Sequence, residues 1–114
     1  MKRVLVTGST GLVGEGICRY FLKDKWNVFG TSRRDIISHH TKFSPIKFEL
    51  GSKNDLDLLN DQLPFKAIIH NAAKLPHSLF NKADIDNYYL SNVKGTRQLL
   101  DWAIEKNIET FIYI

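Results

Sequence analysis

Cysteine and long apolar runs are both scarce in this sequence. Cys18 is the only cysteine, so no internal disulfide can form, which agrees with a reducing compartment. No apolar run approaches the roughly 20 residues that a membrane-spanning helix needs. The apolar stretch after Lys2 and Arg3 is interrupted by Gly8, so it is shorter than the apolar region of a secretory signal, about 7–15 residues. We therefore expect a cytoplasmic protein in which Cys18 is a small packing residue and not a nucleophile.

The sequence also has few clusters of basic residues and no histidines spaced so that they could bind one metal ion. The 114 residues carry a net charge of +4, but lysine and arginine are dispersed apart from the pairs at positions 2–3 and 33–34. Nucleic-acid binding requires basic residues gathered on one face, so we do not expect it here. His39 and His40 are adjacent and point in different directions on any regular element, so we expect no metal site. Binding of a small anionic ligand is a simpler explanation than nucleic-acid binding for the basic pair at positions 33–34.

The sequence does contain a glycine-rich segment directly after its first apolar run. Residues 3–7 are mostly apolar and β-branched, which is typical of a strand buried on both faces. Over residues 12–23 the apolar spacing becomes helical. A strand that passes through a glycine turn into a helix presents backbone N–H groups and the positive end of the helix dipole at one place, which predicts a phosphate or pyrophosphate site. The candidate residues of this turn are Gly8, Ser9, Thr10, Gly11, Leu12, Val13 and Gly14.

Strands and helices alternate along the rest of the chain. We expect the later strands at residues 26–31, 46–50, 66–70 and 111–114, a polar loop at 35–45, a short helix capped by Asn54 and a long helix over 84–106. This alternation predicts an α/β fold in which a doubly wound parallel sheet has five strands in the order 3-2-1-4-5. We expect one domain over residues 1–114.

Three candidate segments follow the carboxyl ends of predicted strands. Residues 8–14 follow the first strand, residues 32–34 the second and residues 71–73 the fourth. In the order 3-2-1-4-5 the ligand crevice lies at the carboxyl ends beside strand 1, where the order reverses. The sequence therefore predicts that these segments converge on one site.

The predicted helices carry apolar stripes. The first helix presents Val13, Ile17, Tyr20 and Phe21. The long helix presents one stripe of Ile85, Tyr89, Val93, Thr96, Leu100 and Ala103, with a second apolar edge of Tyr88, Leu99 and Trp102. So wide a surface fits two interpretations equally: contact with the sheet and with another subunit, as in a homodimer formed through residues 84–106, or a buried helix without a partner.

These segments resemble a known family. The spacing Thr7-Gly8-x-x-Gly11-x-x-Gly14 is similar to the nucleotide-binding turn of the extended short-chain dehydrogenases/reductases, the NAD(P)-dependent epimerase/dehydratase family. The general dinucleotide fingerprint has one residue between its first two glycines, whereas this family has two, as here. Residues 70–73, His-Asn-Ala-Ala, resemble the family's motif after strand 4, and residues 88–103 and 109–114 resemble its next helix and strand. The resemblance implies a Rossmann fold and hydride transfer between a nicotinamide cofactor and a carbonyl or alcohol carbon, with nucleotide sugars as common substrates.

Cofactor choice depends on the residues after the second strand. NAD-preferring members of the family carry an acidic residue there, which holds the adenosine ribose. The aligned residue here is Ser32, and Arg33 and Arg34 follow it. A hydroxyl and a guanidinium can bind a 2′-phosphate that a carboxylate would repel, so we expect NADP, with NAD less suitable. In the alternative, both arginines are solvated and Asp35 binds the ribose.

Further cofactor-binding candidates lie after the third and fourth strands and in the long helix. They are Glu49, Leu50, Asn71, Ala72, Ala73, Lys74 and Asn92. A solvated side chain is the simpler interpretation of Lys74, and the resemblance implies a hydrogen-bonding role behind the catalytic group for Asn92. We expect His70 to pack at the end of its strand. Whether His77 contacts the substrate stays open.

The family's catalytic residues have no counterpart in this chain. Members use a Ser or Thr shortly after the fifth strand and a Tyr-x-x-x-Lys pair on the next helix, where the Tyr acts as acid and base. No tyrosine here has a lysine four residues later. We therefore expect the cofactor-binding part of a longer enzyme, without a substrate domain and without catalytic residues. Two alternatives are a non-catalytic NADP-binding sensor and a mononucleotide- or flavin-binding domain.

Overall fold

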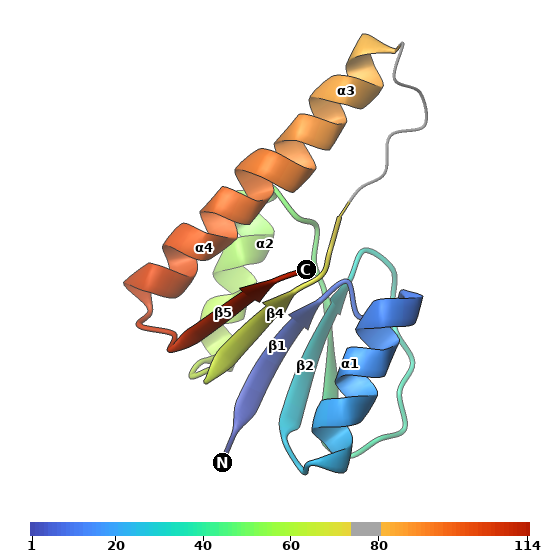
Figure 1. Cartoon of the computed structure of the whole chain (residues 1–114), viewed down its shortest axis with the longest axis vertical. Coiled ribbons are helices and arrows are strands. Elements are labelled where there is room, and N and C mark those ends of the chain that lie inside the picture. Colours follow the sequence, from blue (N-terminus) through green and yellow to red (C-terminus); the bar gives the residue numbers. More distant parts are fainter. Residues whose placement is uncertain (74–80) are drawn as a thin grey trace.

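Within residues 1–73 and 81–114, which the computed structural model describes, five parallel strands form one sheet in the order β3-β2-β1-β4-β5 (Figure 1). The strands are β1 (Arg3–Thr7), β2 (Asn27–Ser32), β3 (Phe43–Lys47), β4 (Ala67–His70) and β5 (Thr110–Tyr113). β1 lies at the centre and pairs with β2 on one side and β4 on the other. The predicted α/β class and strand order are confirmed.

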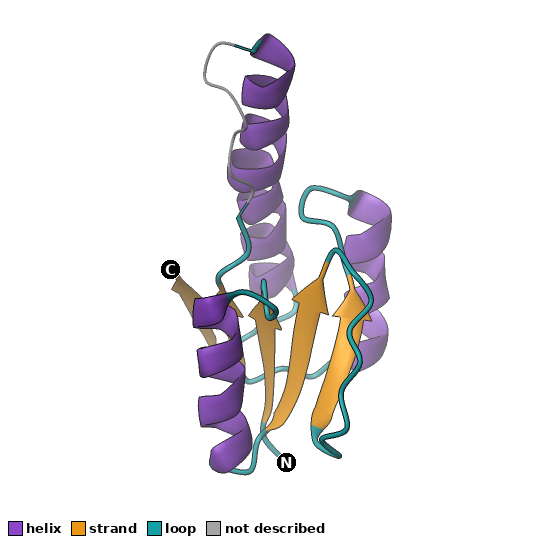
Figure 2. Ribbon diagram, turned by 90° about the vertical axis from the view of Figure 1, so that its right-hand side faces the viewer, coloured by secondary structure: helices purple, strands orange, loops and turns teal. Residues whose placement is uncertain are grey.

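Helices lie on both faces of the sheet (Figure 2). The helix α1 (Leu12–Lys23) covers one face, and the other is covered by α2 (Lys53–Leu58), the 3₁₀ turn η1 (Leu59–Gln62) and α4 (Gly95–Glu105). Alternation along the strands divides the core accordingly, because successive side chains point to opposite faces. Val4 and Val6 pack with Cys18 of α1, whereas Leu5 packs with Trp102 of α4.

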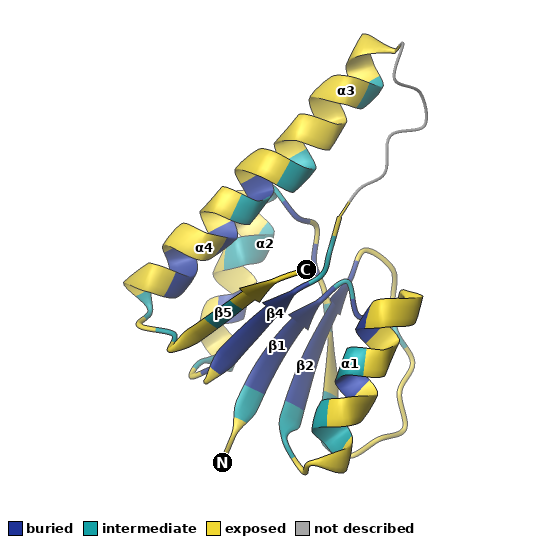
Figure 3. Ribbon diagram, in the orientation of Figure 1, coloured by how far each residue is buried: buried dark blue, intermediate teal, exposed yellow. Residues whose placement is uncertain are grey.

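Burial decreases from the centre of the sheet to its β5 edge (Figure 3). The apolar residues of β1 are fully buried, whereas Ile112 and Tyr113 of β5 are exposed. The continuous apolar sequence of β1 is therefore explained by helices on both of its faces.

The third strand lies earlier than the sequence predicts. The apolar pattern indicates residues 46–50, but β3 spans Phe43–Lys47. Pro45 lies within it, and this is tolerated because β3 is at the edge of the sheet. The N–H of Phe48 donates to the carbonyl of Ser32 on β2 at 2.9 Å. Every second residue of a strand faces the same neighbour, so Pro45, three residues earlier, faces away from β2 and no hydrogen bond to β2 is lost.

The helix starts also differ from the predictions. α2 is capped by Ser52, whose hydroxyl accepts from the N–H of Asp55 at 3.3 Å, and not by Asn54. The long helical segment begins after Asn81 with α3 (Lys82–Tyr89), two residues before the predicted start. No helix among the described residues has the length and apolar character needed to cross a bilayer.

A π-helical turn, η2 (Leu90–Lys94), interrupts the long helix between α3 and α4. α3 extends beyond the sheet (Figure 1) and has no buried residue, so the part of the predicted stripe that lies on α3 does not contact the core. Of the residues predicted for the two apolar edges, only Leu99, Trp102 and Ala103 are buried against the sheet. The exposed apolar residues are Ile85, Tyr88, Tyr89, Leu90, Val93, Leu100 and Ile104, so this helix is not fully buried within the chain. On α1, Ile17 and Phe21 pack against the core as expected, but Val13 and Tyr20 are exposed.

Candidate functional site

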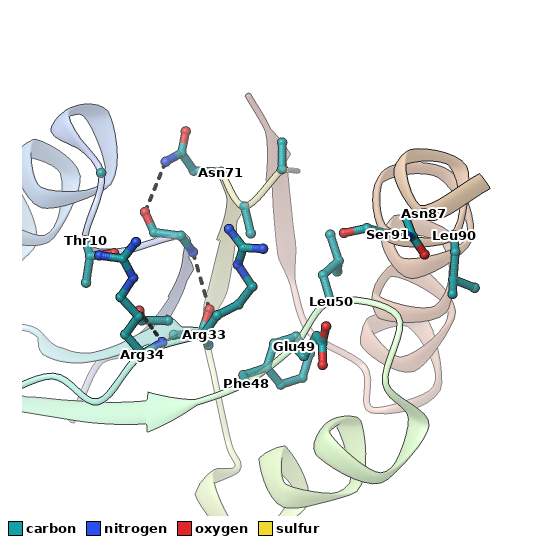
Figure 4. Close-up of a pocket in the computed structure, with 16 residues that line it drawn as sticks. Thr10, Arg33, Arg34, Phe48, Glu49, Leu50, Asn71, Asn87, Leu90 and Ser91 are labelled. Atoms are coloured by element: carbon teal, nitrogen blue, oxygen red, sulfur yellow. Dashed lines mark hydrogen bonds between the residues drawn. The ribbon is translucent and has the colours of Figure 1, made fainter. Parts of the chain in front are cut away.

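A cavity of about 400 Å³ opens at the carboxyl ends of the strands, where the strand order reverses (Figure 4). Its volume is that of a small-molecule site, roughly 300–1,000 Å³. The lining residues are Gly8, Thr10, Gly11, Thr31, Ser32, Arg33, Arg34, Phe48, Glu49, Leu50, Asn71, Ala72, Ala73, Asn87, Leu90 and Ser91. The convergence of the three segments predicted from the sequence is therefore observed.

The glycine turn forms one end of the cavity from backbone atoms. Gly8 has a φ of +65°, a conformation that side chains with a Cβ rarely adopt, and a Cβ there would lie 2.8 Å from the Cα of Ala72. A Cβ on Gly14 would overlap the carbonyl oxygen of Gly8. Gly11 precedes α1 without a capping side chain, so side-chain capping does not satisfy the N–H groups of the first helical turn. This end of the site is shaped to receive an anion close to the backbone.

Two buried hydroxyl residues attach the glycine turn to β2. Both the N–H and the hydroxyl of Ser9 donate to the carbonyl oxygen of Thr31, each at 2.9 Å. The N–H of Gly8 donates to the hydroxyl of Thr31 at 3.3 Å. Ser9 is buried and does not line the cavity, so its role is to hold the turn in place.

Arg33 and Arg34 lie beside the glycine turn, at the end of β2 (Figure 4). Both are exposed, and neither forms an ion pair with another residue in the described part of the chain. The hydroxyl of Ser32 accepts from the N–H of Arg34 at 3.1 Å, which leaves its own hydrogen available to an acceptor. Asp35 does not line the cavity, and its carboxylate lies 3.8 Å from the ammonium of Lys47. Two guanidinium groups and a hydroxyl that can donate therefore lie together at this end of the cavity.

The end of β4 forms the cavity wall beside the glycine turn. The hydroxyl of Thr7 accepts from the N–H groups of Asn71 and Ala72, each at 2.9 Å, and the side-chain amide of Asn71 donates to the carbonyl of Gly8 at 3.3 Å. His70 is fully buried at the strand end, as the sequence predicts, and its two ring nitrogens lie within hydrogen-bond distance of the hydroxyl groups of Thr7 and Thr96. Burial lowers the pKa of His70 to about 4, so its imidazole is neutral at neutral pH.

The far wall of the cavity comes from the segment after β3 and from the long helix. Phe48, Glu49 and Leu50 lie beside Asn87, Leu90 and Ser91 on the side of the cavity away from Thr10 and Arg34 (Figure 4). The two segments approach closely, because a Cβ on Gly95 would lie 2.8 Å from the nitrogen of Gly51.

Five lining residues are absent from the sequence-based candidates, and several candidates do not line the cavity. The residues missed are Thr31, Phe48, Asn87, Leu90 and Ser91. Polar side chains four residues apart, as at Asn87 and Ser91, are common on exposed helices, so the sequence carries no specific signal for that pair. The candidates outside the cavity lining are Ser9, Leu12, Val13, Gly14 and Asn92, and Lys74 and His77 lie outside the described residues. Cys18 is buried in the core on the α1 side, where burial raises its pKa to about 11, so it is a packing residue and not a thiolate nucleophile.

Comparison with known proteins identifies the family. The model of the "NAD dependent epimerase/dehydratase family" matches residues 4–114. A protein from Synechocystis named "Putative dihydroflavonol 4-reductase" is 34% identical over 108 residues, which are 95% of this chain and 31% of that protein.

Solved structures show the same fold. A short-chain dehydrogenase/reductase superfamily protein from Agrobacterium tumefaciens, solved with bound NAD, is 27% identical with a TM-score of 0.79, covering 97% of this chain and 31% of that one. The enzyme WbmH of Bordetella bronchiseptica, solved with NAD+, is 24% identical with a TM-score of 0.82, covering 99% of this chain and 38% of that one. This chain thus spans about a third of the length of these relatives. From its sequence and its fold, the chain belongs to the NAD-dependent epimerase/dehydratase family.

Proposed function

We propose that this chain is the cofactor-binding part of an NADP-dependent oxidoreductase, epimerase or dehydratase. The observation that carries the proposal is the meeting of the glycine turn, residues 32–34 and residues 71–73 in one cavity. When bound, the nicotinamide would supply or accept the hydride exchanged with a carbonyl or alcohol carbon. The residues described here bind and orient the cofactor, and a following segment of the longer protein would supply the catalytic hydroxyl groups.

The pyrophosphate fits the glycine turn. Gly8 and Gly11 line the cavity, and because Gly11 has no side chain, an anion could approach the N–H groups at the start of α1. The positive end of the α1 dipole lies at the same place, since α1 begins at Leu12. This end would bind NAD and NADP equally, because both carry the same pyrophosphate.

The 2′-phosphate of NADP fits Ser32, Arg33 and Arg34. The serine hydroxyl has a hydrogen to donate, and both guanidinium groups are exposed at the cavity. Charge-assisted hydrogen bonds to phosphate are the strongest kind available to side chains. Asp35, which would favour NAD, lies outside the lining and beside Lys47.

The test compares the affinity of the chain for NADPH and NADH after Arg33→Ala and, separately, Arg34→Ala. A hydrogen bond to a charged group contributes about 1.5–3 kcal/mol, so we expect NADPH affinity to fall about 10- to 100-fold in at least one variant while NADH affinity changes less than about twofold. Arg97→Ala is the matched control, because it removes the same charge from an exposed site on α4 outside the cavity. Equal losses for both nucleotides would contradict the 2′-phosphate assignment. Failure of the longest native product to bind either nucleotide at millimolar concentration would contradict the function.

The substrate and partner of the longer protein are further parts of the proposal. We infer a nucleotide sugar as substrate, since such substrates are common in the family, and a cytoplasmic location, since the single cysteine is buried and reduced. The exposed apolar side chains of α3 and η2, with Tyr88, Tyr89 and Val93 among them, favour a homodimer through this helix. Sedimentation of the native product tests the dimer, and a monomer at all concentrations would exclude it.

The same apolar face supports a second candidate function, a non-catalytic sensor in which NADP controls the binding of a protein partner. The sequence that follows Ile114 in the native gene distinguishes the two. A Ser or Thr and a Tyr-x-x-x-Lys pair in that sequence support the enzyme, and their absence supports the sensor.

A further inference from the structure

His70 joins three elements of the fold without lining the cavity. It ends β4 and is fully buried. Its Nδ1 lies 2.7 Å from the hydroxyl oxygen of Thr7 on β1, and its Nε2 lies 2.8 Å from the hydroxyl oxygen of Thr96 on α4. Both ring nitrogens therefore have partners, and each partner is a hydroxyl that can donate or accept.

The hydrogen bonds of Thr7 determine which ring nitrogen carries the proton. A hydroxyl has one hydrogen to donate and two lone pairs to accept with. The Thr7 oxygen already accepts from the N–H groups of Asn71 and Ala72, each at 2.9 Å. Its contact with His70 must therefore use the hydroxyl hydrogen, which makes Nδ1 the acceptor. The ring hydrogen is then on Nε2 and is donated to Thr96.

We propose that His70 is a positioning residue whose neutral Nε2–H tautomer orients the Thr7 hydroxyl, so that both lone pairs of that hydroxyl hold the N–H groups of Asn71 and Ala72 at the cavity wall. The importance of that wall for binding rests on the proposed function. Asn71 extends the connection, since its side-chain amide donates to the carbonyl of Gly8 in the glycine turn. A continuous set of hydrogen bonds thus runs from Thr96 on α4 to the turn that would receive the pyrophosphate.

A proton on Nδ1 would disrupt this arrangement. Two donors would then face each other between His70 and Thr7, and Thr7 could accept from the ring only by releasing Asn71 or Ala72. Because burial lowers the pKa of His70, the ring stays neutral under ordinary conditions and the arrangement persists.

The first test needs no substitution. The ¹⁵N chemical shifts of the His70 ring in the unaltered chain distinguish a protonated from an unprotonated nitrogen. We expect Nε2 to be protonated and Nδ1 to be unprotonated at neutral pH. An Nδ1–H tautomer or an imidazolium would overturn the proposal.

The second test separates positioning from packing. In His70→Asn the amide oxygen lies near the position of Nδ1 and can accept from Thr7, whereas in His70→Gln the amide lies near the position of Nε2 and can replace only the bond to Thr96. We expect amide hydrogen exchange at Asn71 and Ala72 to stay near the wild-type rate in His70→Asn, and to become about tenfold faster in His70→Gln and in Thr7→Val. Equal acceleration in both His70 variants would mean that the side chain only fills space, and would overturn the proposal.

NADPH affinity in the same variants separates this proposal from the proposed function. We expect affinity to follow amide protection, with His70→Asn near wild type and His70→Gln about tenfold weaker. If the ring tautomer and amide exchange behave as expected but no variant binds NADPH differently, the positioning of the wall is supported and its part in cofactor binding is refuted.

Discussion

The two ends of the cavity are built in different ways. At the glycine turn the surface is backbone, and Gly8 and Gly14 pack so closely against their neighbours that neither has room for a side chain. At the end of β2 the surface consists of exposed side chains, those of Arg33 and Arg34. If the proposed function holds, the backbone end would bind either dinucleotide, whereas the side-chain end would distinguish a 2′-phosphate from a hydroxyl. General affinity and cofactor selectivity should therefore be separable by mutation.

The largest effect is expected at the backbone end. In Gly14→Ala the new Cβ would overlap the carbonyl oxygen of Gly8, so the turn must move. Overpacking of this kind costs about 1–3 kcal/mol, and we expect titration to show a loss of up to about 100-fold for NADPH and NADH alike. Gly16→Ala is the matched control, because its new Cβ would meet nothing within 4 Å apart from its chain neighbours and the backbone of its own helix, and the helix should gain up to about 1 kcal/mol. Unchanged binding in Gly14→Ala would show that the turn does not form the site.

A smaller and selective effect is expected at the side-chain end. Ser32→Asp places a carboxylate where we expect the 2′-phosphate, and repulsion between like charges should weaken NADPH binding about tenfold or more. NADH affinity should fall much less, so the ratio of the two affinities is the quantity to measure. Ser44→Asp, on β3 and outside the cavity lining, introduces the same charge as a control. A parallel loss of both nucleotides would mean that the two ends are not independent.

Acid should lower the stability of the fold through His70, which lies behind the cavity wall at the end of β4. Burial lowers the pKa of His70 from its ordinary value of 6.5 to about 4, so between these pH values the unfolded chain binds a proton that the folded chain does not. The free energy of unfolding should therefore fall as the pH drops through this interval, and His70 should contribute a slope of up to about 1.4 kcal/mol per pH unit. At higher pH the contribution of His70 should be constant. Urea unfolding as a function of pH measures the slope, which His70→Asn should reduce. An equal slope in that variant would assign the acid sensitivity to other groups.

The smallest effect is expected where the glycine turn meets β2. Ser9→Ala removes the hydroxyl bond to the carbonyl oxygen of Thr31, but the N–H of residue 9 keeps its own bond to the same oxygen. We expect the free energy of unfolding to fall by about 0.5–1.5 kcal/mol and both nucleotides to weaken slightly and equally. A change in the NADPH to NADH ratio would show that the turn contributes to selectivity after all.

The backbone end is also the part that could be predicted best from the sequence. Glycine spacing and a change from strand to helical periodicity are local signals, and they placed β1 and α1 with the bounds that the structure has. Arg33 and Arg34 were found in the same way, because they follow the second strand directly.

The far wall could not be predicted, because it depends on contacts between distant segments. Pro45 is accommodated in β3 only because that strand is at an edge, which is known once the sheet is assembled. Leu90 and Ser91 line the cavity through a π-helical turn, and the long helix approaches Gly51 at Gly95. Helical periodicity assumes a regular helix and gives no indication of a π-helical turn.

The affinity of the unaltered chain for NADPH and NADH, measured side by side at low and at high salt, tests the central claim most directly. At low salt we predict that NADPH binds about tenfold or more tightly than NADH. The difference should narrow at high salt, because the guanidinium groups of Arg33 and Arg34 are exposed and their attraction to phosphate is screened. Equal affinities at low salt, or tighter binding of NADH, would contradict the account.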